Sequence, residues 1–281
     1  MPATAALALG RSFFGVATMA SGVLQLATGD FVRLVPALPA WIPAHSTWAC
    51  LLGVALVATG LAILSGRMAR TAASVLGIMI LAVVLLLYLP QMVVNPVVDR
   101  PFLRGFMWTN PLKALALVGG AAILVGSSPD EGRPLSALVR RFGRLEPRGS
   151  VFLAIFLVVC GMQHFVYSDF VTVLVPSWIP GQRLWTYFTG VALIAGGAGI
   201  LVPVTARLAA SLSALMIFLW VLLLHIPRAL AGPQHAGEAA GVFEALALSG
   251  EALMVAGTRA RRGPGRGGGR PARGARPIGM V

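Results

Sequence analysis

Residues 161–180 read GMQHFVYSDFVTVLVPSWIP, and residues 22–43 read GVLQLATGDFVRLVPALPAWIP. Both stretches begin with Gly, carry Asp-Phe-Val in the middle and end on Trp-Ile-Pro. Chance matching of apolar residues does not place Asp, Trp and Pro at corresponding positions in this way. The two stretches therefore predict an internal duplication, which is the first feature to seek in any sequence.

The duplication continues through most of the chain. Further matches, in three successive registers, are Asp30 with Asp169, Trp41 with Trp178, Pro90 with Pro227, and Gly119 with Gly250. We therefore predict a first unit over 1–127, a basic linker over 128–149, a second unit over 150–257 and a disordered Arg/Gly-rich tail over 258–281. The tail is too rich in Gly and Arg to form a core.

The composition indicates a membrane protein. Of the 281 residues 57% are hydrophobic and only 11% are charged, and the mean hydropathy is +0.85, whereas a soluble domain has about 25% charged residues. Eight apolar runs come near the roughly 20 residues that a spanning helix needs. They cover about 10–27, 47–65, 70–90, 111–127, 150–167, 183–202, 205–226 and 241–257.

The basic residues predict the orientation. With the N-terminus in the cytoplasm, only six of the 22 basic residues lie outside, as the positive-inside rule requires. Four spans per unit make the two units parallel, related by a pseudo-two-fold axis along the membrane normal. The predicted fold is an all-α membrane protein with eight transmembrane helices, arranged as two tandem, parallel four-helix bundles, N-in and C-in.

The second unit carries HFVYSDF, then VPSWIP, WTYFTGVALIAGG, ARLAA and LHIPR. This series resembles the DoxX-like family of small four-helix membrane proteins, closely over 150–257 and more loosely in the first unit. The resemblance implies one four-helix bundle per unit. The family takes its name from a membrane subunit of a thiosulfate:quinone oxidoreductase, which implies a quinone and a soluble oxidoreductase as partners to consider. Ala55 and Ala192 stand where many members carry Glu, so a proton or quinone role is not carried over from those members. The expected location is the bacterial plasma (inner) membrane, as a multi-pass protein.

Polar residues gather at the outer end of the fifth predicted helix. His164, Tyr167 and Asp169 lie within six residues, and His225 ends the seventh helix at a similar depth. One reading is hydrogen bonding among these residues and the loop that follows. A second is a polar pocket for a quinone or a lipid headgroup. Two His on facing helices also suit a haem, but the first unit has Gln25 and Tyr88 at those positions, so haem is the least favoured.

Ionisable residues inside the predicted spans form a second group of candidates. Glu251 lies about ten residues into the last span, where a charge costs about 2.5–3.5 kcal/mol, so it should be paired, protonated or beside a cavity. Lys113 and Glu244 occupy equivalent positions in the two units. If both face the pseudo-axis they form an inter-unit pair; the alternative is that both extend to the outer interface.

The basic linker and tail predict contact with the anionic lipids of the inner leaflet, since each Arg near the headgroups contributes about 1 kcal/mol. We expect no nucleic-acid partner for a tail tethered to a membrane. The two cysteines, Cys50 and Cys160, form neither a CxxC motif nor a metal-ligand spacing. We therefore predict no metal site.

The sequence contains no nucleotide-binding loop, no GxSxG, no HExxH and no dinucleotide fingerprint, and we predict no catalytic residues. The leading hypothesis is a non-catalytic membrane module that binds a lipid-like or quinone-like ligand or docks a partner. The alternatives are a membrane subunit of a quinone-linked redox complex and a small-molecule transporter. The tentative ligand-binding residues are His164, Tyr167, Asp169, His225 and Glu251.

Overall fold

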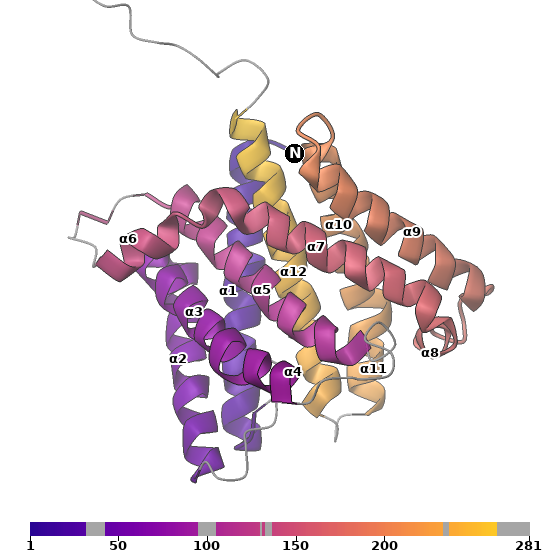
Figure 1. Cartoon of the computed structure of the whole chain (residues 1–281), viewed down its shortest axis with the longest axis horizontal. Coiled ribbons are helices and arrows are strands. Elements are labelled where there is room, and N and C mark those ends of the chain that lie inside the picture. The colour runs from indigo at the N-terminus through magenta and orange to yellow at the C-terminus, as the bar shows by residue number, and fades with distance from the viewer. Residues whose placement is uncertain (32–42, 95–104, 130, 133–136, 233–235, 263–281) are drawn as a thin grey trace, which may run out of the picture.

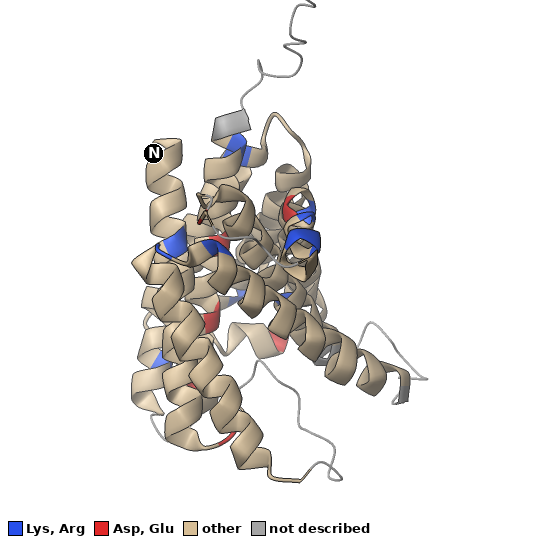
Figure 2. Cartoon of the chain, turned by 90° about the vertical axis from the view of Figure 1, so that its left-hand side faces the viewer, with Lys and Arg blue, Asp and Glu red and all other residues tan. Residues whose placement is uncertain are grey.

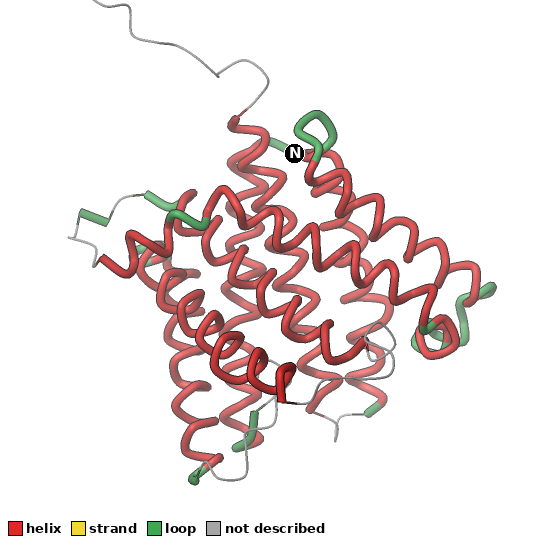
Figure 3. The backbone as a smooth tube through the Cα atoms, in the orientation of Figure 1, coloured by secondary structure: helices red, strands yellow, loops and turns green. Residues whose placement is uncertain are grey.

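Long apolar helices make up the fold (Figure 1, Figure 3). The computed structural model describes residues 1–31, 43–94, 105–129, 131–132, 137–232 and 236–262, and within these ranges it contains no strand. Eight helices are long and apolar enough to cross a membrane. The prediction of an all-α chain with eight apolar spans is confirmed. Residues 258–262 of the predicted disordered tail are instead helical, as the end of α12. Its residues 263–281 and the Trp-Ile of the first repeated stretch lie outside the described residues.

Each unit contributes four long segments. In the first unit these are α1 (Ala3–Thr28), α2 (His45–Ser65), the continuous α3–η1–α4 (Ala69–Val83, Val84–Tyr88, Leu89–Val94) and α5 (Gly105–Ser127). In the second they are α7 (Glu146–Val166), α9 (Gln182–Leu201), α10–η2–α11 (Ala206–Trp220, Val221–His225, Ile226–Ala231) and α12 (Ala236–Arg262). Two short helices, α6 (Ala137–Gly143) and α8 (Ser168–Thr172), lie between them.

The first and last spans begin earlier than the apolar runs predict. Helix α1 begins at Ala3 rather than near residue 10, and α12 at Ala236 rather than near 241. The added turns are rich in Ala, and α12 also has Gly and Glu there. Ala is the strongest helix former, so the helices extend over these positions.

The two ends of the helical bundle are distinct. The start of α1, the end of α12 and the turn 202–205 lie together at the top of Figure 1. Arg207 donates a hydrogen bond to the Met1 carbonyl (3.1 Å), which ties the start of α10 to the N-terminus. The starts of α2 and α12 lie at the opposite end of the bundle.

Helix packing interlocks the two units. Helix α1 packs most extensively against α12 of the other unit, and α5 packs most extensively against α7. By contrast, α1 barely touches α5 within the first unit, and α12 barely touches α7 within the second. The fourth helix of each unit therefore covers the first helix of the other unit. Helices α5 and α12 also contact each other and are the two most buried spans.

Equivalent glycine pairs bring these helices close together. Between α1 and α12, a Cβ built on Gly10 would lie 2.6 Å from the Gly250 carbonyl oxygen, and one on Gly250 would lie 2.7 Å from the Gly10 carbonyl oxygen. Between α5 and α7, the Gly119–Gly149 pair would give 2.6 Å in both directions. Real Cβ atoms do not approach a backbone so closely, so these backbones meet only because both sides are glycine.

A π-helical turn interrupts the third helix of each unit at the same place. The turns Val84–Tyr88 and Val221–His225 have the sequences VLLLY and VLLLH and precede Pro90 and Pro227. Proline has no N–H to donate into the helical ladder. The widened turn fits this loss: Leu89 N–H bonds to the Val84 carbonyl and Ile226 N–H to the Val221 carbonyl, each five residues back.

The linker is docked on the first unit at the end of the bundle where α1 begins and α12 ends. Phe142 of α6 is buried against Gly77 of α3, whose missing side chain leaves room for the ring. The carboxylate of Glu131 accepts hydrogen bonds from the N–H groups of Arg70 and Thr71 and from the Thr71 hydroxyl. These groups stand at the first turn of α3, where N–H donors lack partners within the helix. The linker thus caps the third helix.

The outer surface of the helices is apolar. Charged residues are sparse along the spans (Figure 2), and only about a quarter of the residues in the most apolar part of the spans Gln182–Leu201 and Ala206–Ala231 are buried. Large apolar side chains on these two helices are exposed, including Leu184, Phe188, Val191, Leu208 and Leu212. A soluble protein rarely exposes contiguous apolar surface on this scale, whereas a bilayer accommodates it. The fold is that of a multi-pass membrane protein.

Candidate functional site

A buried ion pair joins the two central helices. Lys113 Nζ of α5 lies 2.6 Å from Glu244 Oε2 of α12, and the side chains are only 10% and 12% exposed. The structure thus brings together the two residues that occupy equivalent positions in the two units. Lys113 also lies within electrostatic range of Cys160 on α7, and Glu244 within range of Tyr88 at the end of η1.

Glu244 has a second oxygen that is not satisfied. Its Oε1 is buried and, within the described ranges, has no hydrogen-bond partner. A buried acceptor without a partner costs about 1–3 kcal/mol, and more when it is charged. Such an atom in a folded protein calls for an explanation, and a bound ligand or water is among the usual ones.

Glu244 borders a pocket between α1, α2, α3, α5 and α12. The space that the centres of water molecules can reach is about 40 Å³, which is enough for a few waters because one water needs about 10–15 Å³. Most of the lining is apolar, and four lining side chains are polar: Thr18, Ser21, Gln25 and Glu244. The residues Ser21, Leu24 and Phe243 are only half-buried, so this side of the pocket is not fully covered.

Sequence reasoning missed the polar face of α1. Thr18, Ser21 and Gln25 are spaced three and four residues apart, which places them on one face of a helix. Gln25 is buried and its Nε2 donates to the Ala49 carbonyl (2.7 Å), while Thr18 Oγ1 donates to the Phe14 carbonyl (2.8 Å). The spacing of three polar residues in an apolar span was the signal that could have revealed this face.

His164 and His225 of the second unit stand at the positions equivalent to Gln25 and Tyr88 of the first unit. His164 stacks on Trp220, with ring centroids 6.2 Å apart, and its Nδ1 lies 2.8 Å from the Cys160 carbonyl oxygen. His225 is the last residue of the π turn η2. Within the described ranges no group of three His, Cys, Asp or Glu is arranged to hold a metal ion. Neither histidine lines the pocket beside Glu244.

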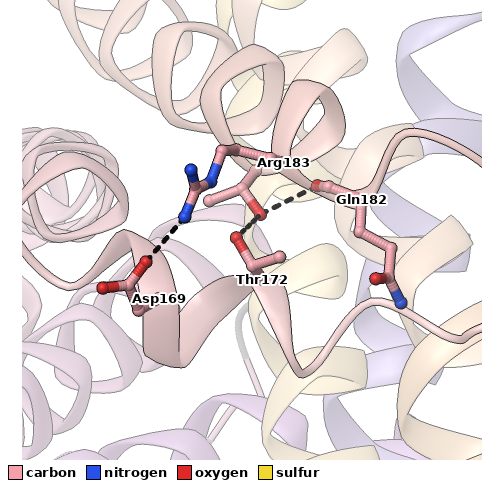
Figure 4. Close-up of polar contacts among 5 residues, drawn as sticks. Asp169, Thr172, Gln182 and Arg183 are labelled. Atoms are coloured by element: carbon pink, nitrogen blue, oxygen red, sulfur yellow. Dashed lines mark hydrogen bonds and ion pairs between the residues drawn. The ribbon is translucent and has the colours of Figure 1, made fainter.

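Tyr167 and Asp169 lie where the chain turns from α7 to α8. Tyr167 separates the two helices. Asp169 Oδ1 accepts a hydrogen bond from Arg183 (2.9 Å), and both side chains are largely exposed (Figure 4). Thr172 and Thr186 hydroxyls lie 3.2 Å apart and join α8 to α9. These contacts hold α8 against the start of α9, with Phe170 and Trp178 exposed nearby. Neither Tyr167 nor Asp169 lines the pocket.

Glu251 is fully buried on α12, two turns beyond Glu244. Both of its carboxylate oxygens lack a hydrogen-bond partner among the residues that the structure describes. Gly119 and Gly120 make room for it, since a Cβ on Gly119 would lie 3.2 Å from Glu251 Oε1. Glu251 does not line the pocket beside Glu244. The structure thus places two carboxyl groups one above the other along α12, and among the described residues only the first of them is paired with a cation.

Comparison with known proteins leaves the chemistry of this site open. A family model described as a domain of unknown function (DUF8561) matches residues 153–262, which is most of the second unit. No curated protein and no solved structure matches the chain.

Proposed function

We propose that this chain is a non-catalytic membrane module of DoxX-like type that holds a lipid-like or quinone-like amphiphile beside Glu244. The observation that carries the proposal is the pocket itself: a mostly apolar space that contains four polar side chains and one unsatisfied buried carboxylate oxygen. Sites for small molecules have this composition, with apolar walls and a few polar groups that orient the ligand.

The position of the pocket supports an amphiphile over a water-soluble ligand. The half-buried residues at its open side, Ser21, Leu24 and Phe243, lie on α1 and α12 within apolar spans. A molecule that approaches from the bilayer can place its polar head beside Glu244 and leave its chain against Leu24 and Phe243. The present space fits only a small head, so larger heads require lining side chains to move.

We further propose that the two units are tandem, parallel four-helix repeats, interlocked through their fourth helices, in a bacterial inner membrane with both termini in the cytoplasm. The support is the distribution of basic residues.

The topology can be tested at two exposed residues, Asp169 and Val204, which lie in segments that it puts on opposite sides of the membrane. In a chain without Cys50 and Cys160, Asp169→Cys should react with a membrane-impermeant maleimide in intact cells, and Val204→Cys only after lysis. The reverse pattern would contradict the topology.

The proposed ligand site is tested by native mass spectrometry of the full chain released from its own lipids. We expect the wild-type chain to retain an additional small mass, and Ser21→Leu to lose it, because the larger side chain fills the pocket from α1. Ser12→Leu makes the same change on the same helix outside the lining and should retain the mass.

Two results would count against the proposal. One is a wild-type chain that carries no mass beyond scattered phospholipid. The other is equal retention by Ser21→Leu and Ser12→Leu, which would show that the retained molecule binds elsewhere. In either outcome, the masses in the spectrum also show whether the bound molecules are of one kind or of several.

A further inference from the structure

We infer that the pocket selects a neutral amphiphile whose head donates a hydrogen bond, such as a phenol or an alcohol, over one that only accepts. This inference rests on the proposed function and adds to it the chemical class of the ligand. It follows from counting which donors and acceptors around the pocket are already used.

The polar atoms that line the pocket leave one buried acceptor to satisfy. Thr18 spends its only hydroxyl proton on the Phe14 carbonyl, and Gln25 spends one N–H on the Ala49 carbonyl, while the Ser21 hydroxyl also lines the pocket as a donor. Lys113 satisfies Glu244 Oε2. Of all the lining side chains, the one buried polar atom that remains without a partner among the described residues is Glu244 Oε1. A carboxylate oxygen with a neighbouring Lys is an acceptor only, so the group that satisfies it must carry an N–H or O–H.

The ion pair also decides the charge of the ligand. Lys113 already neutralises Glu244 at 2.6 Å. A cationic head would bring a second positive charge to the Lys113–Glu244 pair, which is already neutral. Removing that charge from water costs free energy that no further anion in the pair would offset. A neutral hydroxyl brings the required proton without that cost, so it is favoured over an ammonium group.

The test compares 4-nonylphenol with 4-nonylanisole, which differ by the replacement of O–H with O–CH₃. Binding of each is measured to the full chain in lipid nanodiscs, with empty nanodiscs subtracted. We expect the phenol to bind about tenfold more tightly, as a hydrogen bond to a buried charged group allows. Glu244→Gln should reduce this preference to within about twofold, because Lys113 holds the amide oxygen and the amide N–H₂ then faces the ligand.

Three variants make the result decisive. The double change Lys113→Gln with Glu244→Gln keeps the pair neutral and should also lose the preference, which covers the case that Glu244→Gln fails to fold. Glu238→Gln removes a carboxylate on the same helix that pairs with Arg228 outside the pocket, and it should keep the preference. Ser21→Leu should block both probes.

The outcomes separate the two proposals. If both probes bind the wild-type chain equally and Ser21→Leu blocks both, the pocket stands and the donor preference is wrong, with water satisfying Oε1. If neither probe binds above empty nanodiscs, the ligand site and its preference fail together. If the phenol is preferred in every variant including Glu244→Gln, the preference has another origin and the inference is overturned.

Discussion

Gly250→Ala should destabilise the protein by about 3 kcal/mol or more, the upper range for overpacking a closely fitted interface. The added methyl group would lie 2.7 Å from the Gly10 carbonyl oxygen, 2.9 Å from Phe13 Cβ and 2.9 Å from Phe14 N. Two of these atoms belong to the backbone of α1, so no change of rotamer relieves the contact. The two helices must separate along the most extensive helix contact in the protein.

The direction of this effect makes the prediction informative. Ala in place of a mid-helix Gly stabilises an isolated helix by about 1 kcal/mol, so helix propensity alone predicts that Gly250→Ala is stabilising.

The measurement is thermal unfolding of the purified chain in detergent. Gly119→Ala, the equivalent change at the α5–α7 contact, should behave like Gly250→Ala. Gly143→Ala meets only a side-chain atom at 3.4 Å and should leave the midpoint within a few degrees. A Gly250→Ala protein as stable as wild type would show that α1 and α12 do not meet as described.

The second large effect concerns the central ion pair. Lys113→Ala leaves Glu244 buried without its cation and should cost about 3–5 kcal/mol of unfolding free energy. Glu244→Ala should cost a similar amount for the opposite charge. The double change Lys113→Met with Glu244→Leu should recover most of the loss, because apolar residues of similar volume replace a buried pair at little cost.

The duplication provides an unusual control for this pair. Lys113 and Glu244 occupy equivalent positions in the two units, so Lys113→Glu with Glu244→Lys places each side chain on a similar backbone. We expect the exchanged pair to restore stability in a double-mutant cycle but to lose the preference for the phenol over the anisole, because the pocket then faces an ammonium group, which donates and does not accept. The exposed pair Asp169–Arg183 is the matched comparison, and Arg183→Ala there should cost less than about 1 kcal/mol. Costs that are equal at the two pairs would contradict a buried, structural role for Lys113 and Glu244.

Several features of the candidate site were visible in the sequence. Lys113, Glu244 and Glu251 stand out because charges are rare in apolar spans, and the repeat register aligned the first two. The pocket was not predicted, although its polar residues on α1 have helical spacing. A pocket is the space left between five helices, and its position depends on how closely each pair packs. His164, Tyr167, Asp169 and His225 stay predictions as ligand residues, since none of them lines this pocket.

The sequence by itself determined the eight apolar helices, because the length and hydrophobicity that a bilayer demands are local properties of each segment. It also determined the register of the duplication, because Asp, Trp, Gly and Pro recur at matching positions. Only the tertiary structure decided that α1 packs on α12 and α5 on α7, rather than α1 on α5. Apolar helices in lipid have many nearly equivalent partners, and the choice rests on close contacts such as Gly10 with Gly250 that pair residues 240 positions apart. The pocket beside Glu244 is a consequence of that choice.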